Sequence, residues 1–314
     1  MDGALIIDKP AGMTSHDVVA RVRRIIGERR VGHTGTLDPF ATGVLVLLLG
    51  RATRLAQFLS GAEKEYEAVI RLGYATDTGD LTGTRRGTEL HAKPQSPQSF
   101  RGEEIEPALA SLRGEIEQMP PMYSAKKVGG RKLYELARKG EEVERKAARV
   151  LISELIAIDS GGSLLKENED GSNDLRVRVV CSAGTYIRTL AEDLGKKLGM
   201  GAHLAELRRT RAGEFRVEDA ITLDRLVELA GLRQIETRLI SPDSVLSHLP
   251  MVQMNLDEAA RTINGIDLDI ENDVSQIWRD NQPVRMRGSD GQLIAVGIYD
   301  ESRSAVHPRV VISS

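Results

Sequence analysis

A segment rich in glycine near the N-terminus has features of a functional site. Residues 32–43 read Gly-His-Thr-Gly-Thr-Leu-Asp-Pro-Phe-Ala-Thr-Gly, with one carboxylate, Asp38, between Leu37 and Pro39. Glycines let a backbone approach a ligand closely, and the neighbouring proline gives Asp38 a rigid support. Such a carboxylate is a candidate catalytic group. A lone Asp-Pro is also typical of a tight turn in which the aspartate caps a backbone amide, so the segment alone leaves both interpretations open.

The segments around this loop predict the elements that position it. An apolar run precedes the turn at Lys9-Pro10, and Thr14 or Ser15 then caps a helix with Asp17 in its first turn. Apolar periodicity predicts strands at 3–8, 42–49, 64–73, 175–181, 203–210 and 214–217, and helices at 14–27, 55–59, 103–118, 132–139 and 184–199. Polar or glycine-rich stretches predict loops at 73–83, 89–102 and 161–174.

Mixed strands and helices with long connections indicate an α+β fold. The chain has 314 residues, which favours two domains, and Pro242 and Pro250 bracket a polar stretch suited to a boundary. We therefore expect a domain at 1–245, with a basic insertion at about 120–149, and a small β-rich domain at 246–314. Within the latter, Gly288-Ser289-Asp290-Gly291 predicts a hairpin between strands at 282–287 and 293–299.

Composition excludes several classes of protein. The only cysteine, Cys181, rules out an internal disulfide and a cysteine-rich zinc site. The longest apolar stretch, at 43–50, suits a buried strand and is too short to span a bilayer. The N-terminus lacks the basic start and cleavage site of a signal peptide, so we expect a cytoplasmic protein without membrane contact.

Positive charge is clustered although the formal net charge is -3. The three clusters are Lys126 to Arg149, with nine basic residues against four acids; Arg21, Arg23, Arg24, Arg29 and Arg30; and Arg208, Arg209, Arg211 and Arg216. A single charged run is usually a solvated helix face. Three clusters beside the motifs given below favour contact with the phosphates of RNA, because the field that a nucleic acid meets is local.

The loop at 32–39 resembles the Gly-His-x-Gly-x-Leu-Asp-Pro signature of the bacterial TruB-type tRNA pseudouridine synthases, which carries their essential aspartate. Further segments are similar to this family, in the family's order: Asp-Lys-Pro-x-Gly at 8–12, Lys-x-Tyr at 64–66, Thr-Asp-Thr-x-Asp at 76–80, Pro-Pro-x-x-Ser-Ala-x-Lys at 120–127, Gly-Thr-Tyr-Ile-Arg at 184–188 and Leu-Arg-Arg-Thr at 207–210. The resemblance covers roughly residues 1–223. It implies a pseudouridine synthase fold, with a mixed, mostly antiparallel sheet flanked by helices.

The resemblance also implies an activity: isomerisation of the uridine at position 55 in the T loop of tRNA, with the target base flipped out. Asp38 would attack or deprotonate the target nucleoside, and Arg188 would pair with Asp38. Tyr66 would stack on the flipped uracil and later act in proton removal at C5. These residue types suit the task, since an aromatic ring stacks on an extruded base and an arginine keeps a carboxylate oriented.

Other residues take substrate-binding roles by the same resemblance. Tyr186 would line the pocket, Leu207 would pack against the base, His33 would fill the space that the base leaves, and Lys9 with Pro10 would support the loop. The remaining candidates for substrate binding are Asp77, Lys126, Lys127, Arg131 and Arg208. Residues 283–297 resemble a hairpin of a PUA-like RNA-binding domain, which could meet RNA or serve as a structural lid. The isomerisation adds and removes nothing overall, so we expect no cofactor or metal. We also expect a monomer without an obligate protein partner.

Alternative functions fit the residues less well. Phosphatases with an aspartate nucleophile carry a second aspartate two positions on, where this chain has Phe40. A glycosidase usually needs a second carboxylate, and the loop around Asp38 offers none. An RNA-binding or RNA-folding protein without catalysis remains a second hypothesis, against which the presence of Asp38, Tyr66 and Arg188 argues.

Overall fold

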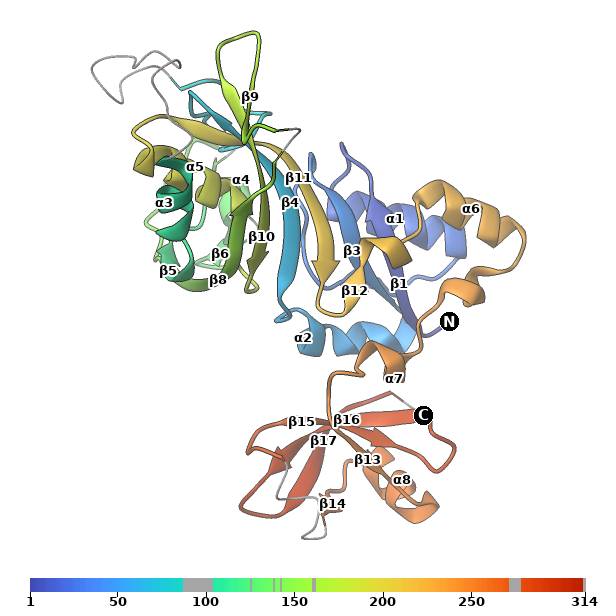
Figure 1. The fold of residues 1–314 in the computed structure, drawn as a ribbon. Helices are drawn as coiled ribbons and strands as arrows, with labels where there is room; N and C mark the ends of the chain where they lie inside the picture. Colours follow the sequence, from blue (N-terminus) through green and yellow to red (C-terminus); the bar gives the residue numbers. More distant parts are fainter. Residues whose placement is uncertain are drawn as a thin grey trace.

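The computed structural model describes residues 1–86, 104–124, 126–137, 139–141, 143–159, 162–270 and 278–312, without the side chains of residues 127, 128, 132 and 134. Among these residues, ten strands form one mixed sheet (Figure 1). Its main path runs β1 (Gly3–Lys9), β3 (Thr42–Leu49), β11 (Ala202–Ala212), β4 (Lys64–Leu72), β10 (Asn173–Cys181), β8 (Ala148–Ala157) and β5 (Gly114–Gln118). Three short strands lie beside it: β2 (Val31–His33) on β3, β9 (Leu165–Glu167) on β10 and β12 (Phe215–Arg216) on β11.

The junction between β3 and β11 is parallel, whereas the other strand pairs described in this sheet are antiparallel. β3 is apolar and buried along almost its whole length because both of its faces are covered. Val44 and Val46 pack into one cluster, while Leu45 and Leu47 pack into another. A strand buried on both faces reads as a continuous hydrophobic run, which is the pattern seen in the sequence.

Helices cover the sheet on either side of that junction. α1 (Ser15–Ile26) and α6 (Leu223–Gly231) pack their apolar faces on β1 and β3, while α3 (Ile105–Ala110) and α5 (Ile187–Lys197) cover the half built from β11, β4, β10 and β8 (Figure 1). Thr14 caps α1 through a capping box with Asp17. α4 (Leu133–Ala137) follows the small hairpin β6 (Lys127–Val128) and β7 (Arg131–Lys132).

A second sheet contains the chain beyond residue 250, in the order β13 (Met251–Gln253), β15 (Pro283–Arg287), β16 (Leu293–Asp300), β17 (Ala305–Val311) and β14 (Leu268–Asp269), with α8 (Leu256–Ile263) beside it. It follows α7 (Pro242–Val245) and lies next to α2 (Ala56–Leu59) and the 3-10 helix η1 (Gly50–Leu55) (Figure 1). Leu293, Val296 and Val310 share one core cluster with β1, β3 and η1. The small sheet is therefore packed against the large one.

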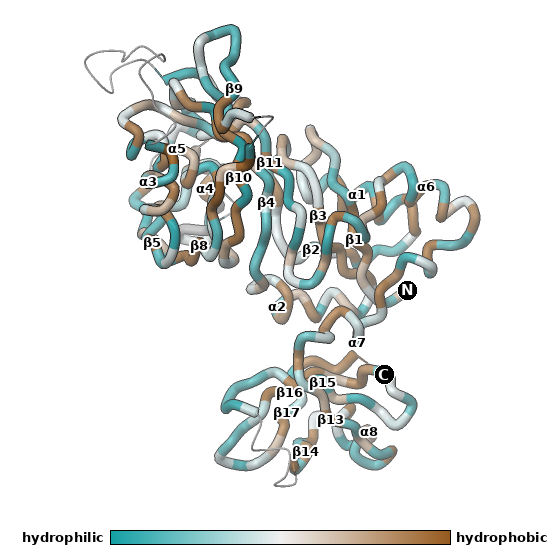
Figure 2. Tube along the Cα trace, in the orientation of Figure 1, coloured by the Kyte–Doolittle hydropathy of each residue, from teal (hydrophilic) through white to brown (hydrophobic). Residues whose placement is uncertain are grey.

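Most of the predicted elements are confirmed. The strands at β1, β3, β4, β10, β11 and β12, the helices at α1 and α5, and the hairpin β15–β16 lie where the patterns place them. The protein is thus α+β with a small β-rich C-terminal domain, as predicted. Figure 2 shows hydrophilic residues in loops such as the one that carries β9 and hydrophobic residues along inner strands such as β10.

Two local predictions were wrong, and one long strand was missed. The helix predicted for 103–118 ends at Ala110, and Gly114, at φ 87°, begins β5, so Ile116 lies on a strand. The loop predicted for 161–174 contains β9, which pairs with the start of β10. The strand β8 was missed because its first residues were assigned to the basic stretch that ends at Arg149. The insertion predicted at 89–102 lies outside the described residues.

Gly43 allows β3 to reach its parallel neighbour. Its φ is 99°, and a Cβ at this position would overlap the backbone of Arg209 on β11. We predict that Gly43→Ala lowers the free energy of unfolding by roughly 2–6 kcal/mol, the sum of left-handed strain and overpacking. Urea titration followed by circular dichroism measures the change. Gly61→Ala is the matched control, because a Cβ there meets nothing within 4 Å. Equal stability of the two variants would contradict the prediction.

Candidate active site

Asp38 lies in a turn that other segments hold on both sides. The Ser15 hydroxyl donates to the Leu37 carbonyl at 3.2 Å and accepts from the Leu37 amide at 2.9 Å. On the other side, the fully buried Lys9 donates from Nζ to the Pro39 carbonyl at 3.1 Å and to two carbonyls of its own turn. The start of the chain thus fixes the backbone on either side of Asp38.

Arg188 binds the Asp38 carboxylate with two hydrogen bonds. Its Nε donates to Asp38 Oδ2 at 2.9 Å and its Nη2 donates to Asp38 Oδ1 at 3.1 Å. The guanidinium also donates to the carbonyl oxygens of Thr78 at 3.0 Å and Tyr123 at 2.7 Å. With only 5% of its side chain exposed, Arg188 is held in one orientation by four acceptors from three segments far apart in sequence. This is the strong bidentate geometry of an arginine–carboxylate pair.

The position of Arg188 in its helix explains why it needs this partner. It is the second residue of α5, where the helix dipole disfavours a positive charge. Asp38 offsets that cost. The start of α5 is pinned by Gln118 at the end of β5, whose side-chain amide accepts from the Tyr186 backbone N–H at 2.7 Å and donates to the Tyr186 carbonyl at 3.1 Å.

A second carboxylate, Asp80, lies near the same guanidinium nitrogen that binds Asp38. Its Oδ2 is 3.8 Å from Arg188 Nε. Its other oxygen accepts from the Thr78 hydroxyl at 2.8 Å and from the Thr82 amide at 3.0 Å and hydroxyl at 2.6 Å. Asp80 therefore orders the 76–82 loop and places a second negative charge near Arg188.

The local environment changes the proton affinity of Asp38. Burial raises the pKa of this carboxyl above its ordinary value, and the negative charge of Asp80 adds to the rise, while the charge and hydrogen bonds of Arg188 oppose it. A carboxylate with a raised pKa is a better base and a better nucleophile than an ordinary aspartate.

Asp38 lines a cavity of about 260 Å³, whose other lining groups are aromatic rings, aliphatic groups and a few polar atoms. Tyr66, Tyr186 and Leu207 line it together with Asp38 and Arg188. Burial raises the pKa of Tyr66 against the opposing effect of the Arg209 charge, so the phenol is neutral at neutral pH. The Ser124 hydroxyl also lines the cavity, is buried, and has no hydrogen-bond partner among the described residues. The cavity suits a flat ring with polar edges.

His33 lies on β2 outside the lining of this cavity. Its ring packs edge-on against His16 with centroids 5.3 Å apart. Burial, with His16 and Arg209 nearby, lowers the pKa of His33 to about 4, so its ring is uncharged at neutral pH. The Nδ1 atom of His33 is buried without a partner in the described part of the chain.

The structure does not bring the other substrate-binding candidates into the cavity. Asp77 is exposed, and its carboxylate accepts from the Thr84 amide at 2.8 Å. Arg208 pairs with Asp8 at 2.8 Å and borders a separate hollow of about 360 Å³. Lys126 is exposed, and Arg131 is half exposed and pairs with Glu141 at 3.2 Å. The side chain of Lys127 lies outside the described residues.

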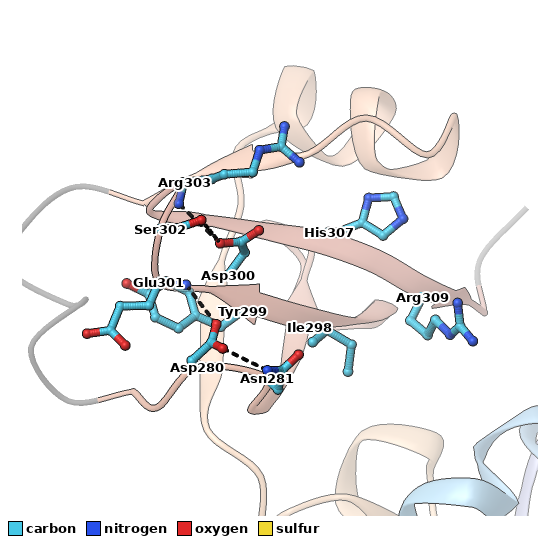
Figure 3. Close-up of a pocket in the computed structure, with 10 residues that line it drawn as sticks. All are labelled: Asp280, Asn281, Ile298, Tyr299, Asp300, Glu301, Ser302, Arg303, His307 and Arg309. Atoms are coloured by element: carbon cyan, nitrogen blue, oxygen red, sulfur yellow. Dashed lines mark hydrogen bonds between the residues drawn. The ribbon is translucent and has the colours of Figure 1, made fainter.

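The largest hollow described, about 950 Å³, lies in the small C-terminal sheet, away from Asp38 (Figure 3). Figure 3 shows acidic and basic side chains side by side around it, among them Asp280, Asp300, Arg303 and Arg309. It is a shallow concavity in the surface, and nothing in it parallels the convergence of groups on Arg188.

Sequence reasoning missed four residues that line or order the cavity: Asp80, Ser124, Lys64 and Arg209. Each lies inside a motif that the sequence displayed, so the segment was found but the residue was not singled out. The sequence does not show that Lys64 and Arg209 are buried. Without the structure of the sheet, both look like ordinary surface cations. No described helix is long and apolar enough to cross a membrane.

Solved structures share this architecture. The chain superposes on a chain of a Cbf5-Nop10-Gar1 complex with a TM-score of 0.72 and 27% identity, over 99% of this chain and 84% of that one. A chain of an H/ACA RNP bound to a substrate RNA containing 2'-deoxyuridine gives a TM-score of 0.70 and 25% identity, over 99% and 85%. The fold and the site define the protein as a pseudouridine synthase, an isomerase that converts uridine in RNA to pseudouridine.

Sequence comparisons give the family. Residues 23–187 match the model of the N-terminal domain of the TruB family pseudouridylate synthases, and residues 188–246 match the tRNA pseudouridylate synthase B C-terminal domain. Proteins named tRNA pseudouridine synthase B are 48% identical in Geobacillus kaustophilus, over 84% of this chain and 90% of that protein, and 46% identical in Geobacillus thermodenitrificans, over 84% and 85%. The chain belongs to the TruB family of pseudouridylate synthases, as the sequence motifs predicted.

We predict that Asp80→Asn lowers the rate of pseudouridine formation and moves its acid limb to lower pH. Neutralising Asp80 weakens its attraction to Arg188, and it removes a negative charge that raises the pKa of Asp38. The family motif implies that ionised Asp38 carries the rate. The rate would then be lost as pH falls through the pKa of Asp38, so a lower pKa would preserve activity further into acid. A profile of kcat/KM against pH tests this, with the exposed Asp224 of α6 changed to Asn as the control. An acid limb that stays in place would contradict the prediction.

Proposed function

We propose that this protein isomerises the uridine at position 55 in the T loop of tRNA and that Asp38 is its catalytic carboxylate. The observation that carries the proposal is the Asp38–Arg188 pair at the wall of a cavity that Tyr66 and Leu207 also line. The names of the relatives support tRNA as the RNA, and the motif at 32–39 supports the site.

The size of the cavity fits a single extruded nucleobase. A base stacked inside a folded RNA is out of reach of Asp38, so the target nucleotide must flip into the protein, which costs a few kcal/mol. Stacking on Tyr66 recovers about 1–3 kcal/mol. Leu207 supplies an apolar contact on the neighbouring strand, and Tyr186 closes another side. His33, with its neutral ring, is suited to fill the gap left in the RNA.

The chemistry needs one carboxylate and a fixed cation. The bond from ribose C1′ to uracil N1 breaks, the ring turns, and C5 forms the new bond to C1′. The C5 proton then leaves, and N1 gains a proton, so the atoms balance. Asp38 acts on the nucleoside as nucleophile or base, Arg188 keeps it oriented, and Tyr66 serves the removal of the C5 proton. No cofactor or metal enters this sequence of steps.

The surface around the cavity supplies contacts to the RNA. We assign Lys126, Lys127, Arg131 and Arg208 to the phosphates, and we keep Asp77 as a candidate for other contacts to the RNA. We also assign residues 1–245, with the insertion at 120–149, to catalysis, and residues 246–314 to a PUA-like domain. The packing of Leu293, Val296 and Val310 against the large sheet supports a structural role for that domain. We further propose that the protein acts as a monomer in the cytoplasm, without an obligate partner.

We predict that Asp38→Asn abolishes pseudouridine formation and leaves the Kd for tRNA within roughly tenfold, because asparagine keeps the shape of the side chain and loses the charge on which catalysis depends. Unmodified tRNA incubated with each protein and mapped by carbodiimide-stop sequencing reports both activity and position. Asp224→Asn serves as the control for loss of one carboxylate. Modification of the T loop by Asp38→Asn, or of a different uridine by the unchanged protein, would overturn the proposal.

Binding should depend strongly on salt. Each phosphate neutralised by a lysine or arginine releases counterions, so log Kd should change linearly with log salt concentration. Lys126→Met and Arg131→Met should each weaken binding and reduce the slope by about 1. Filter binding between low and physiological salt measures this, with the exposed Lys197 of α5 changed to Met for comparison. A flat salt response, or slopes unchanged in both variants, would remove these residues from the RNA interface.

A further inference from the structure

Two buried cations lie beside Tyr66 in the wall of the Asp38 cavity. Lys64 is two residues before Tyr66 on β4, so their side chains lie on the same face of the sheet. Arg209 is directly opposite Tyr66 on the neighbouring strand β11. Both cations line the cavity, and only 8% of Lys64 and 2% of Arg209 is exposed. The sheet register therefore places positive charge on two sides of the ring on which we expect the base to stack.

These cations are held by backbone carbonyls. Lys64 Nζ donates to the Ser60 carbonyl at 2.8 Å and the Ala62 carbonyl at 2.5 Å. Arg209 donates from Nε to the Val44 carbonyl at 2.7 Å and from Nη2 to the Gly35 carbonyl at 3.1 Å. In the described part of the chain, neither forms an ion pair with a carboxylate.

Buried charges are usually paired, because leaving water is costly for an ion. The cost is visible at Lys64, where burial and the charge of Arg209 lower the pKa to about 8. The other titratable neighbour is Cys181 on β10, whose pKa burial raises to about 11, so it is neutral at pH 8. Asp38 shares the cavity but is already paired with Arg188. The wall thus carries uncompensated positive charge.

The reaction can supply the missing negative charge. When the bond between C1′ and N1 breaks, its electron pair stays with the uracil ring and spreads to the ring oxygens, while C1′ becomes electron-poor. C5 later returns an electron pair to C1′ in the new bond. The base is neutral when it enters and is negative only while detached, so cations beside Tyr66 would act on that stage more than on binding.

We propose that Lys64 and Arg209 stabilise the negative charge on the uracil ring while it is detached from the ribose. The inference rests on the proposed role of the Asp38 cavity. Fixed charges in a site closed to water act strongly because they need no reorganisation as the charge develops. Arg209 also ties the Gly35 and Val44 segments together, so Lys64 is the residue at which charge can be tested with less risk to the fold.

The experiment compares Lys64→Met and Lys64→Gln with the unchanged protein on unmodified tRNA, with the exposed Lys197→Met as control. Met keeps the length without charge, and Gln keeps an N–H donor without charge. We expect both to lower kcat/KM at pH 7 by about 10²-fold, the effect typical of a lost group that stabilises developing charge. The Kd for tRNA and the thermal unfolding midpoint should stay close to those of the unchanged protein, and Lys197→Met should behave like it.

The pH dependence separates charge from structure. The ammonium form acts below the Lys64 pKa of about 8 and is lost as pH rises through it. The ratio of kcat/KM between the unchanged protein and Lys64→Met should therefore be constant below pH 7 and fall toward 1 above pH 8. Other groups that titrate in both proteins cancel in this ratio.

Three results would overturn the inference. The first is full activity of Lys64→Met or Lys64→Gln. The second is a ratio that does not change with pH, which indicates a structural role. The third is weaker binding with a smaller salt slope and an unchanged rate for bound tRNA, which indicates a phosphate contact. If Asp38→Asn is inactive in the same assay, these results reject the role of Lys64 and Arg209 alone; if Asp38→Asn is active, the proposed function itself fails.

Discussion

The ion pair between Asp38 and the buried Arg188 is the interaction on which the rest of the site depends. The guanidinium has acceptors in the 32–43 loop, the 76–82 loop and the segment before β6, and it projects from the start of α5. The planar guanidinium of Arg188 thus fixes the relative position of four parts of the chain. A lysine could not do this, since a single ammonium on a flexible stem lacks the fixed directions of five N–H donors. The pair therefore fixes the geometry of the carboxylate, and it opposes the rise in pKa that burial causes at Asp38.

The parallel junction between β3 and β11 brings the Asp38 loop to the middle of the sheet instead of its edge. Because Gly43 has no side chain, the strand that leaves the loop can lie against Arg209, and the cavity forms where β11 and β4 continue. Irregularities in the β11–β4 register near Ala205 and Thr210 accompany Leu207 and Arg209, which both line the cavity. Such bulges are often found next to active sites, where they redirect side chains.

Local patterns in the sequence were sufficient for elements whose burial is regular. The apolar run of β3 and the alternation of β10 each have one simple solution in a sheet covered by helices. The 103–118 segment was misjudged because Ile105, Leu109, Leu112 and Ile116 keep helical spacing across a turn that only Gly114 marks. In the site, Asp38 and Arg188 were found through the family motifs, whereas Asp80 and Lys64 were not. Asp80 matters because it contacts Arg188, 100 residues or more away in the sequence, and Lys64 matters because it is buried. The local spacing of residue types reveals neither a long-range contact nor burial.

The charge of the whole chain says little about the charge of the site. The formal net charge is -3, yet Lys64 and Arg209 are buried in the wall of the cavity, Lys9 is buried beneath the Asp38 loop, and all three are bound by backbone carbonyls. Carbonyl oxygens fix the positions of these cations but leave their charge uncancelled, whereas a carboxylate partner would neutralise it. An enzyme that must hold a detached anionic ring needs its cations immobile and unneutralised before the ring arrives. Binding such cations through main-chain carbonyls achieves both conditions. The arrangement destabilises the charged form of these lysines when no substrate is bound, because burial is the main cause that lowers the pKa of Lys9 and of Lys64, each to about 8.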